Sequence, residues 1–197
     1  MGEKKEYRSA VRSRRMIRKA FLDLLREKAF EKITVTDIVK RADINRSTFY
    51  AHYPDVRGLV EELMGESVDA SIQLVTRIDF RDLFLDPTPF LQGLTAIGEE
   101  NIELYKLLSQ SDFALRQTEI MKATLIERAI TTVDIPEHIR NSSIFHIHTH
   151  FFVGGILSIY QQWLQGKLDC STQEIMDQVG RLITGNRELY LSWYESA

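Results

Sequence analysis

The sequence predicts an all-α protein of two domains, and three observations support this. Apolar residues recur at helical spacing along most of the 197 residues, and neither Asn-Gly nor Asp-Gly, the usual hairpin turns, occurs. The four prolines stand where predicted helices begin or end. Residues 1–57 hold 15 Lys or Arg against 8 Asp or Glu, whereas residues 58–197 hold 10 against 20. We therefore expect a basic domain at 1–57 and an acidic domain at 58–197.

Composition excludes several classes of protein. With 44% hydrophobic and 27% charged residues, the chain is neither disordered nor a coiled-coil rod. The single cysteine, Cys170, excludes a disulfide framework and a cysteine zinc site. The N-terminus lacks the apolar core of a signal peptide, and the apolar run 151–157 is far shorter than the ~20 residues that span a bilayer. We expect a cytoplasmic protein without a membrane partner.

Helical periodicity predicts eight helices in order. The first carries an apolar stripe at the i, i+4, i+8 spacing of one helix face. Two helix starts have the spacing of a capping box, Thr34 with Asp37 and Ser171 with Glu174. The predicted ranges are 9–28, 35–42, 46–53, 56–77, 89–109 (with a break near Gly98), 112–133, 138–165 and 172–194 (with a break near Gly185).

The second and third helices have the pattern of a helix-turn-helix. A short capped helix, a three-residue turn and a second short helix occupy residues 33–53, and Pro54 ends the pair. Asn45 is a suitable N-cap for the second helix, whose outward side chains are not acidic. Such side chains hydrogen-bond base edges or phosphates when the helix enters the major groove, although a helical hairpin with solvated polar residues has a similar pattern. The outward residues are Arg46, Ser47, Thr48, Tyr50 and His52, with Thr36 nearby, and the phosphate candidates are Arg14, Arg15 and Arg57.

Residues 12–63 resemble the N-terminal domain of the TetR family of bacterial transcriptional regulators. The resemblance is carried by Ile33 to Ile38, by Ala42 and by the string from Thr48 to Pro54. It implies an N-terminal three-helix helix-turn-helix domain, a C-terminal helical ligand-binding and dimerisation domain, and a homodimer on a palindromic operator in double-stranded DNA. Two positions depart from the family pattern. Asp43 replaces the usual turn glycine, and Val56 replaces a lysine that grips a phosphate, so that Arg57 is the nearest substitute.

The acidic domain has a weaker resemblance to the C-terminal domain of TetR-type regulators of Gram-positive bacteria, through Phe152 to Ile156 and Trp163-Leu164. The resemblance implies that the last two long helices form a dimer interface. Paired glycines in a helix cost ~1 kcal/mol each, so they suggest a close helix contact, between subunits or within one. The interface candidates are Phe151, Gly154, Gly155, Val179, Ile183 and Trp193.

The acidic domain has weaker indications of a metal, catalytic or ligand site. His146 and His150 share a helix face while His148 points elsewhere, and no carboxylate completes a set, so we predict no metal site and no cofactor. Catalytic motifs are absent as well, and we expect no enzyme, although an all-α enzyme using a cavity of this domain is the rival hypothesis. We expect an apolar pocket for a small-molecule effector, whose candidate lining residues are Tyr105, Phe113, Met121 and His148. We therefore predict a repressor released by that effector, with an activator or a protein-responsive adaptor as alternatives.

Overall fold

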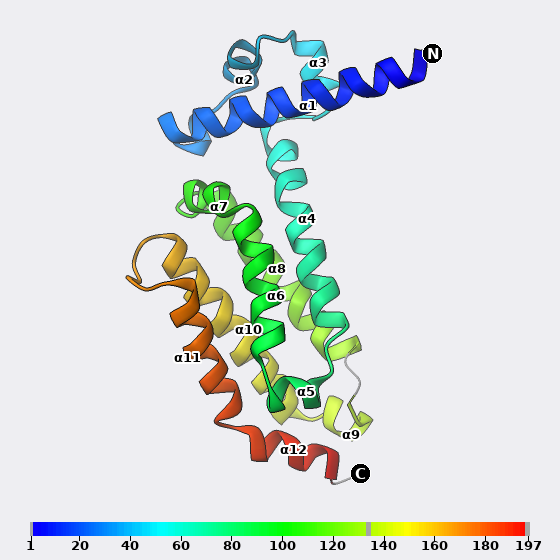
Figure 1. Ribbon diagram of the computed structural model, residues 1–197, viewed down its shortest axis with the longest axis vertical. Coiled ribbons are helices and arrows are strands. Elements are labelled where there is room, and N and C mark those ends of the chain that lie inside the picture. The colour runs from blue at the N-terminus through cyan, green and yellow to red at the C-terminus, as the bar shows by residue number, and fades with distance from the viewer. Residues whose placement is uncertain (1, 133–134, 196–197) are drawn as a thin grey trace. The chain divides into compact units, whose positions relative to one another are not determined.

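The computed structural model describes residues 2–132 and 135–195, with the side chains of residues 2–8, 80 and 193–195 outside the description. Within this part of the chain every regular element is helical, as the sequence predicts (Figure 1). The chain divides into two compact units, Met1–Glu66 and Ser67–Ala197. The elements are α1 (Gly2–Glu27), the 3-10 helix η1 (Phe30–Lys32), α2 (Val35–Ala42), α3 (Arg46–Tyr50), α4 (Val56–Thr76), α5 (Phe80–Leu85), α6 (Thr88–Glu100), α7 (Ile102–Leu108), α8 (Asp112–Thr132), α9 (Glu137–Arg140), α10 (Ser143–Leu164), α11 (Thr172–Thr184) and α12 (Arg187–Glu195).

Several helix boundaries differ from the predicted ones: α1 begins at Gly2 rather than at residue 9, α3 ends at Tyr50 rather than at residue 53, and three further differences have a local cause. The short α5 is not predicted, because six residues are too few to show a period; Asp79 caps it by accepting from two backbone N–H groups. The fifth predicted helix breaks at Asn101 rather than at Gly98. Glycine at position 98 instead lets Tyr160 of α10 approach α6 closely, because a Cβ there would overlap the Tyr160 hydroxyl. The predicted helix 138–165 is two helices, because Ser142 starts α10 by accepting a hydrogen bond from the Phe145 N–H.

In the first unit, α2 and α3 pack on the same side of α1 (Figure 1). The core between them is small and aromatic, and Phe21, Ile38 and Phe49 are fully buried. The start of α4 completes this core with Leu59 and Val60, which have no exposed surface. Consequently the boundary between the compact units lies inside α4 at Glu66 and Ser67, whereas the change of charge sign placed it at 57 and 58.

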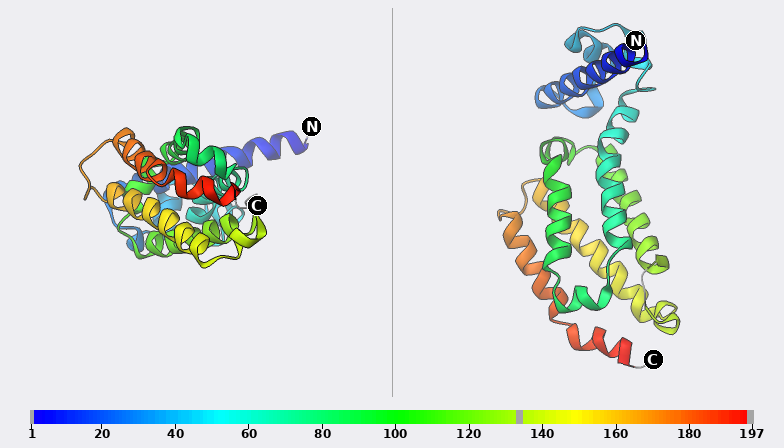
Figure 2. Two further views of the ribbon diagram at one scale, coloured as in Figure 1. Left: turned by 90° about the horizontal axis from the view of Figure 1, so that it is seen from below. Right: turned by 45° about the vertical axis from the view of Figure 1, so that its right-hand side comes forward.

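The second unit is built from the rest of α4 and from α5 to α12. The long helices α8 and α10 pack along each other, and α11 packs on α6. The last helix, α12, crosses beneath α5 in each side view (Figures 1 and 2). One apolar cluster joins these helices through buried residues such as Phe84, Leu125, Phe145, Val179 and Tyr190. Residues of this cluster line the apolar cavity described below.

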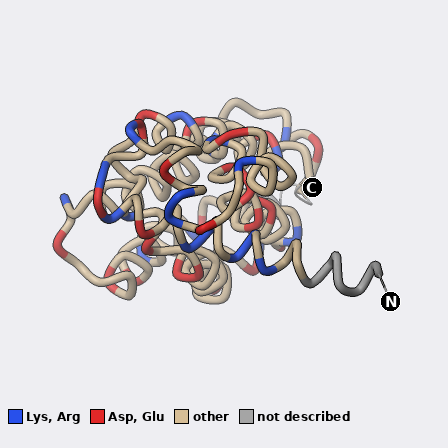
Figure 3. Tube along the Cα trace, turned by 90° about the horizontal axis from the view of Figure 1, so that it is seen from above, with Lys and Arg blue, Asp and Glu red and all other residues tan. Residues whose placement is uncertain are grey.

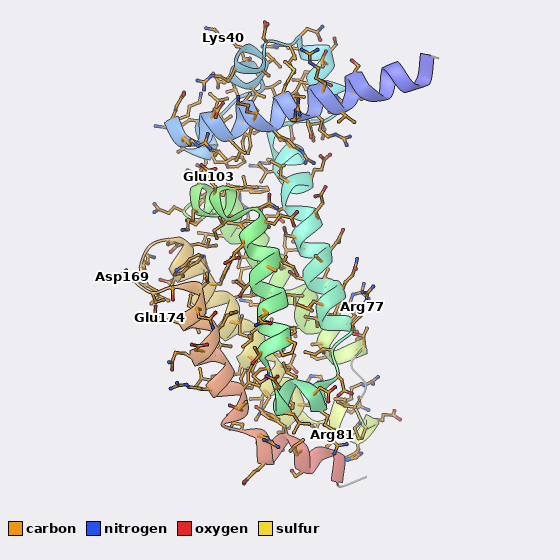
Figure 4. The ribbon with its side chains drawn as sticks, viewed as in Figure 1. Lys40, Arg77, Arg81, Glu103, Asp169 and Glu174 are labelled. Atoms are coloured by element: carbon orange, nitrogen blue, oxygen red, sulfur yellow. The ribbon has the colours of Figure 1, made fainter. Side chains whose placement is uncertain are left out.

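Both predicted capping boxes are present, one in each unit. Thr34 and Ser171 each accept a hydrogen bond from the backbone N–H three residues on, and the side chains of Asp37 and Glu174 bond back to the cap. Glu174 lies on the first turn of α11 (Figure 4). Among the described helices, none is long and apolar enough to cross a membrane.

Candidate nucleic-acid interface

The start of α2 is fixed by a dense set of hydrogen bonds. The Asp37 N–H donates to Thr34 Oγ1 at 3.2 Å, while the Thr34 N–H and hydroxyl donate to Asp37 Oδ2 at 2.9 and 2.7 Å. Lys28 Nζ lies 2.7 Å from the same carboxylate. The bonds from Lys28 and Thr34 hold the pKa of Asp37 well below its ordinary value. The helix that carries Thr36 and Lys40 therefore has a defined start, and Lys40 is exposed on α2 (Figure 4).

The turn between α2 and α3 depends on Asp43. Its backbone is left-handed, with φ 51° and ψ 51°, which is the conformation for which glycine is usual. Asp tolerates this region better than most residues, so the predicted turn is present despite the missing glycine. The N–H groups of Asp43 and Ile44 donate to the Val39 carbonyl, which closes the end of α2.

Asn45 organises the first turn of α3. Its Oδ1 accepts the Thr48 N–H at 2.7 Å and the hydroxyls of Ser47 and Thr48 at 2.7 and 2.8 Å. On the inner side of the helix Phe49 is fully buried and packs on Tyr53, with ring centroids 5.8 Å apart. On the outer side Arg46, Ser47 and Tyr50 are exposed, and 53% of Tyr50 is accessible. This short helix is therefore anchored by its cap and its inner aromatic ring while its polar side faces solvent.

The structure brings together two of the residues predicted to face DNA. Arg46 Nη2 donates to Thr36 Oγ1 at 2.7 Å, so the guanidinium of α3 is held against the start of α2. An arginine steadied on one side keeps its other N–H groups for guanine O6 and N7 or for a phosphate. Figure 3 marks in blue the Lys and Arg residues of α1 to α3 that are described.

Two other predicted DNA-facing residues are turned partly inward. His52 lies beyond the end of α3, and its Nε2 is 2.7 Å from the Ser13 hydroxyl of α1. Burial, and then the charge of Arg14, lowers the pKa of His52. Thr48 is half-buried, with its hydroxyl bonded to Asn45.

The predicted phosphate contacts are all exposed. Arg15 and Arg57 lie on the surface of α1 and of the first turn of α4. Arg14 is also exposed, although its Nε is 3.9 Å from Glu62 Oε1. Exposure is compatible with a contact to DNA, which stays a prediction for all three.

An ion-pair network that was not predicted from the sequence joins α1 to the start of α4. Arg18 Nη2 lies 2.5 Å from Glu62 Oε1, and the Tyr53 hydroxyl donates to the same oxygen at 3.0 Å. Burial raises the pKa of Glu62, but the hydrogen bonds from Arg18 and Tyr53 outweigh it and the net shift is downward. The partners are 44 and 9 residues apart in sequence, so no local spacing indicates them.

Comparison with known proteins agrees with this geometry. Residues 17–63 match the family model described as bacterial regulatory proteins, tetR family. Over these residues the N-terminal unit is therefore similar to TetR-family regulatory proteins. Over 75 residues the chain is 39% identical to a Bacillus subtilis (strain 168) protein named uncharacterized HTH-type transcriptional regulator YxbF; the match covers 38% of this chain and only 20% of that relative.

Two solved structures extend the likeness to the whole fold. One is a TetR transcriptional regulator from Streptococcus agalactiae 2603V, with a TM-score of 0.59 and 23% identity over 92% of this chain and 98% of the other. The second is the dihydroxyacetone kinase operon activator DhaS, with a TM-score of 0.60 and 19% identity over 90% and 97% of the two chains. These matches confirm the predicted fold class, in which a helical domain follows the TetR-type helix-turn-helix.

The second unit contains an apolar cavity of about 80 Å³. His148 lines it, and its predicted role in binding an effector stays a prediction. The other three candidates lie elsewhere: Phe113 is buried on α8, Met121 packs against the apolar cluster without lining the cavity, and Tyr105 of α7 is half-buried. Helical spacing shows that an apolar residue faces the interior, but it does not show whether that residue packs in the core or lines a cavity. The sequence therefore could not identify the lining residues. The full lining is Val75, Ile78, Leu83, Phe84, Phe90, Ala129, Phe145, His148, Thr149, Phe152, Val153, Ile156, Ile183 and Tyr190.

The candidate interface residues divide into three groups. Phe151 is 69% exposed on α10, and a Cβ added at Gly154 or Gly155 would meet no other atom within 4 Å. By contrast Val179 and Ile183 are buried in the core of their own unit, because they lie on the inner face of α11. Both are therefore poorly placed to contact a partner in this conformation. Trp193 has its side chain outside the described part of the structure.

The histidines of α10 do not converge. His146 Nε2 is 3.0 Å from the Arg140 carbonyl, His148 Nδ1 is 2.6 Å from the Tyr190 hydroxyl, and His150 is exposed. Among the residues that the structure describes, no three His, Cys, Asp or Glu side chains are grouped as metal ligands.

Proposed function

We propose that this protein is a cytoplasmic, homodimeric repressor that binds a palindromic operator in double-stranded DNA and is released by a small-molecule effector. The observation that carries the proposal is the anchored α3, whose outer side presents Arg46, Ser47 and Tyr50. In a two-fold dimer, two such helices reach one face of B-DNA when the half-sites lie about one helical turn apart, ~34–36 Å.

The surface of α10 supports the dimer. Ile144, Ile147 and Phe151 are 53%, 64% and 69% exposed at the i, i+3, i+7 spacing of one helix face. Open space above Gly154 and Gly155 continues this face and would admit the backbone of a second helix. An apolar stripe of this kind is covered in a closed two-fold interface, where the same patch is used twice.

Release by an effector follows from a shift in population. The dimer can adopt conformations that differ in the distance between its two α3 helices. An effector that binds more tightly to a conformation with the wrong distance lowers the fraction of dimers that fits the operator. The apolar cavity lined by His148 is the site we assign to it. The same fold would serve an activator or a protein-responsive adaptor, so the position of the operator relative to its promoter separates these alternatives.

The experiment is a selection of bound fragments from the source genome, followed by titration of the operator. Arg46→Ala is expected to lower affinity by about 1–3 kcal/mol and to relax base preference at one position in each half-site. Lys32→Ala is the control, because it removes one exposed positive charge outside the helix-turn-helix and should leave base preference unchanged. Log K should fall with log salt by about 0.9 for each phosphate contacted. Absence of salt-dependent binding to any duplex would refute the proposal.

The dimer is tested separately by sedimentation. Phe151→Asp should shift the protein from dimer to monomer at micromolar concentration, because it places a charge in the apolar stripe. Ile120→Asp is the matched control, since Ile120 is 58% exposed on α8 and lies outside that stripe. A monomeric wild type, or equal effects of the two variants, would contradict the proposed interface. Copurified metal or turnover of a substrate in the cavity would instead favour the all-α enzyme.

A further inference from the structure

Tyr190 occupies an aromatic site in the second unit. It belongs to the last helix, α12, and is 1% exposed, whereas its neighbour Leu189 is 45% exposed. The ring stacks on Phe84 of α5, with centroids 3.8 Å apart and planes at 15°. The rings of His148 and Phe152 form T-shaped contacts with it, at centroid distances of 5.2 and 6.1 Å. Three sides of the phenol are therefore formed by aromatic groups from other helices.

A hydrogen bond to His148 helps to orient the phenol. The Tyr190 hydroxyl and His148 Nδ1 are 2.6 Å apart. Burial raises the pKa of Tyr190 to about 12, so the hydroxyl is neutral and keeps its proton for hydrogen bonding. Flat apolar faces with a small number of well-placed polar groups are the usual features of a site for a small aromatic molecule.

The remaining space is too small for such a molecule. The cavity beside Tyr190 measures about 80 Å³. An apolar cavity of about 150 Å³ is known to hold benzene, so an aromatic ring does not fit here while Tyr190 is in place. If Tyr190 leaves, the volume of its own ring is added to the cavity, and the freed site has the shape and the hydrogen-bonding group that suit a phenol.

We propose that Tyr190 is a built-in occupant of the effector site, and that a small monocyclic phenol displaces it, stacks on Phe84, bonds to His148 and releases α12. This inference rests on the proposed function, because it assigns the chemistry of the effector site named there. The hydroxyl is required because a ligand without one leaves the His148 ring nitrogen without the bond that Tyr190 supplied. Release of α12 is the conformational change that such a ligand brings about.

The test uses the full chain without DNA, so its outcome is independent of operator binding. The probe is p-cresol, which is the side chain of tyrosine, and toluene is its analogue without the hydroxyl. Tyr190→Ala should bind p-cresol at least tenfold more tightly than the wild type, because the competing ring is gone. Toluene should bind that variant more weakly than p-cresol by roughly 2- to 10-fold, since one hydrogen bond is lost. In the wild type, saturating p-cresol should speed amide exchange in residues 187–192.

A second variant covers the case in which Tyr190→Ala does not fold. Tyr190→Phe keeps the ring but not the hydroxyl, so its α12 stays docked. Because the ring of this variant no longer competes for the hydrogen bond to His148, p-cresol should bind the variant several-fold more tightly than it binds the wild type. The proposal is overturned if p-cresol binds the wild type without faster exchange in α12, or if neither folded variant binds it more tightly than the wild type does. An operator titration that fails while these results hold would refute the DNA-binding function and leave the phenol site standing.

Discussion

The two units of this chain use opposite means to hold their functional groups. In the first unit, directed hydrogen bonds place nearly every polar group around α3: Asn45 caps it, Thr36 holds Arg46, and Ser13 holds His52. In the second unit the cavity wall is almost wholly apolar, and a hydrogen bond between His148 and Tyr190 helps to orient its occupant. Directed bonds fix one geometry, whereas apolar contacts tolerate repacking. The difference suits a rigid DNA-binding helix in one unit and an adaptable ligand site in the other.

The largest expected effect comes from removing a fully buried ring in each unit. Phe49→Ala should lower the free energy of unfolding of the first unit by about 3–5 kcal/mol, because it leaves a cavity where the inner face of α3 packs. Phe145→Ala, at 1% exposure in the second unit, is the matched change. Amide exchange resolved by residue should show each loss confined to its own unit. Loss of protection throughout the chain in both variants would show that the units do not unfold separately.

How much the sequence predicts can be judged from particular residues. The capping boxes at Thr34 and Ser171 were predictable because their contacts are three residues apart, and the helix-turn-helix was predictable because only three residues join its two helices. The site of Tyr190 was not, since Phe84 and His148 are 106 and 42 residues away from it. The inward turn of Val179 and Ile183 was missed for a related reason. Periodicity shows that they share a face of α11 but not which neighbour covers that face.

A smaller effect is expected from the ion-pair network of the first unit. Glu62→Gln removes the charge that Arg18 Nη2 contacts at 2.5 Å. The free energy of unfolding should fall by about 1–2 kcal/mol, because both side chains are about one-third exposed and solvent screens part of the interaction. Glu66→Gln is the control, since Glu66 is 75% exposed and 3.9 Å from the same guanidinium. Its effect should stay within about 0.5 kcal/mol. Urea unfolding monitored at α1 to α3 measures the free energy of unfolding of both variants. Equal losses of stability in the two variants would mean that the network contributes little.

The smallest expected effect is a pH dependence from His52. Burial and then the charge of Arg14 lower its pKa in the folded state, although Glu62 opposes the shift. The folded state therefore binds the proton less readily than the unfolded state, whose His pKa is about 6.5. The contribution to stability is complete above that pH and is lost as the pH falls through the folded-state pKa. His52→Gln keeps a side chain able to hydrogen-bond Ser13 but does not titrate there. Between pH 7.5 and 5.5, the wild type should lose more protection in α1 to α3 than this variant does. Equal losses in the two proteins would mean that His52 is as free to take up a proton in the folded unit as in the unfolded chain.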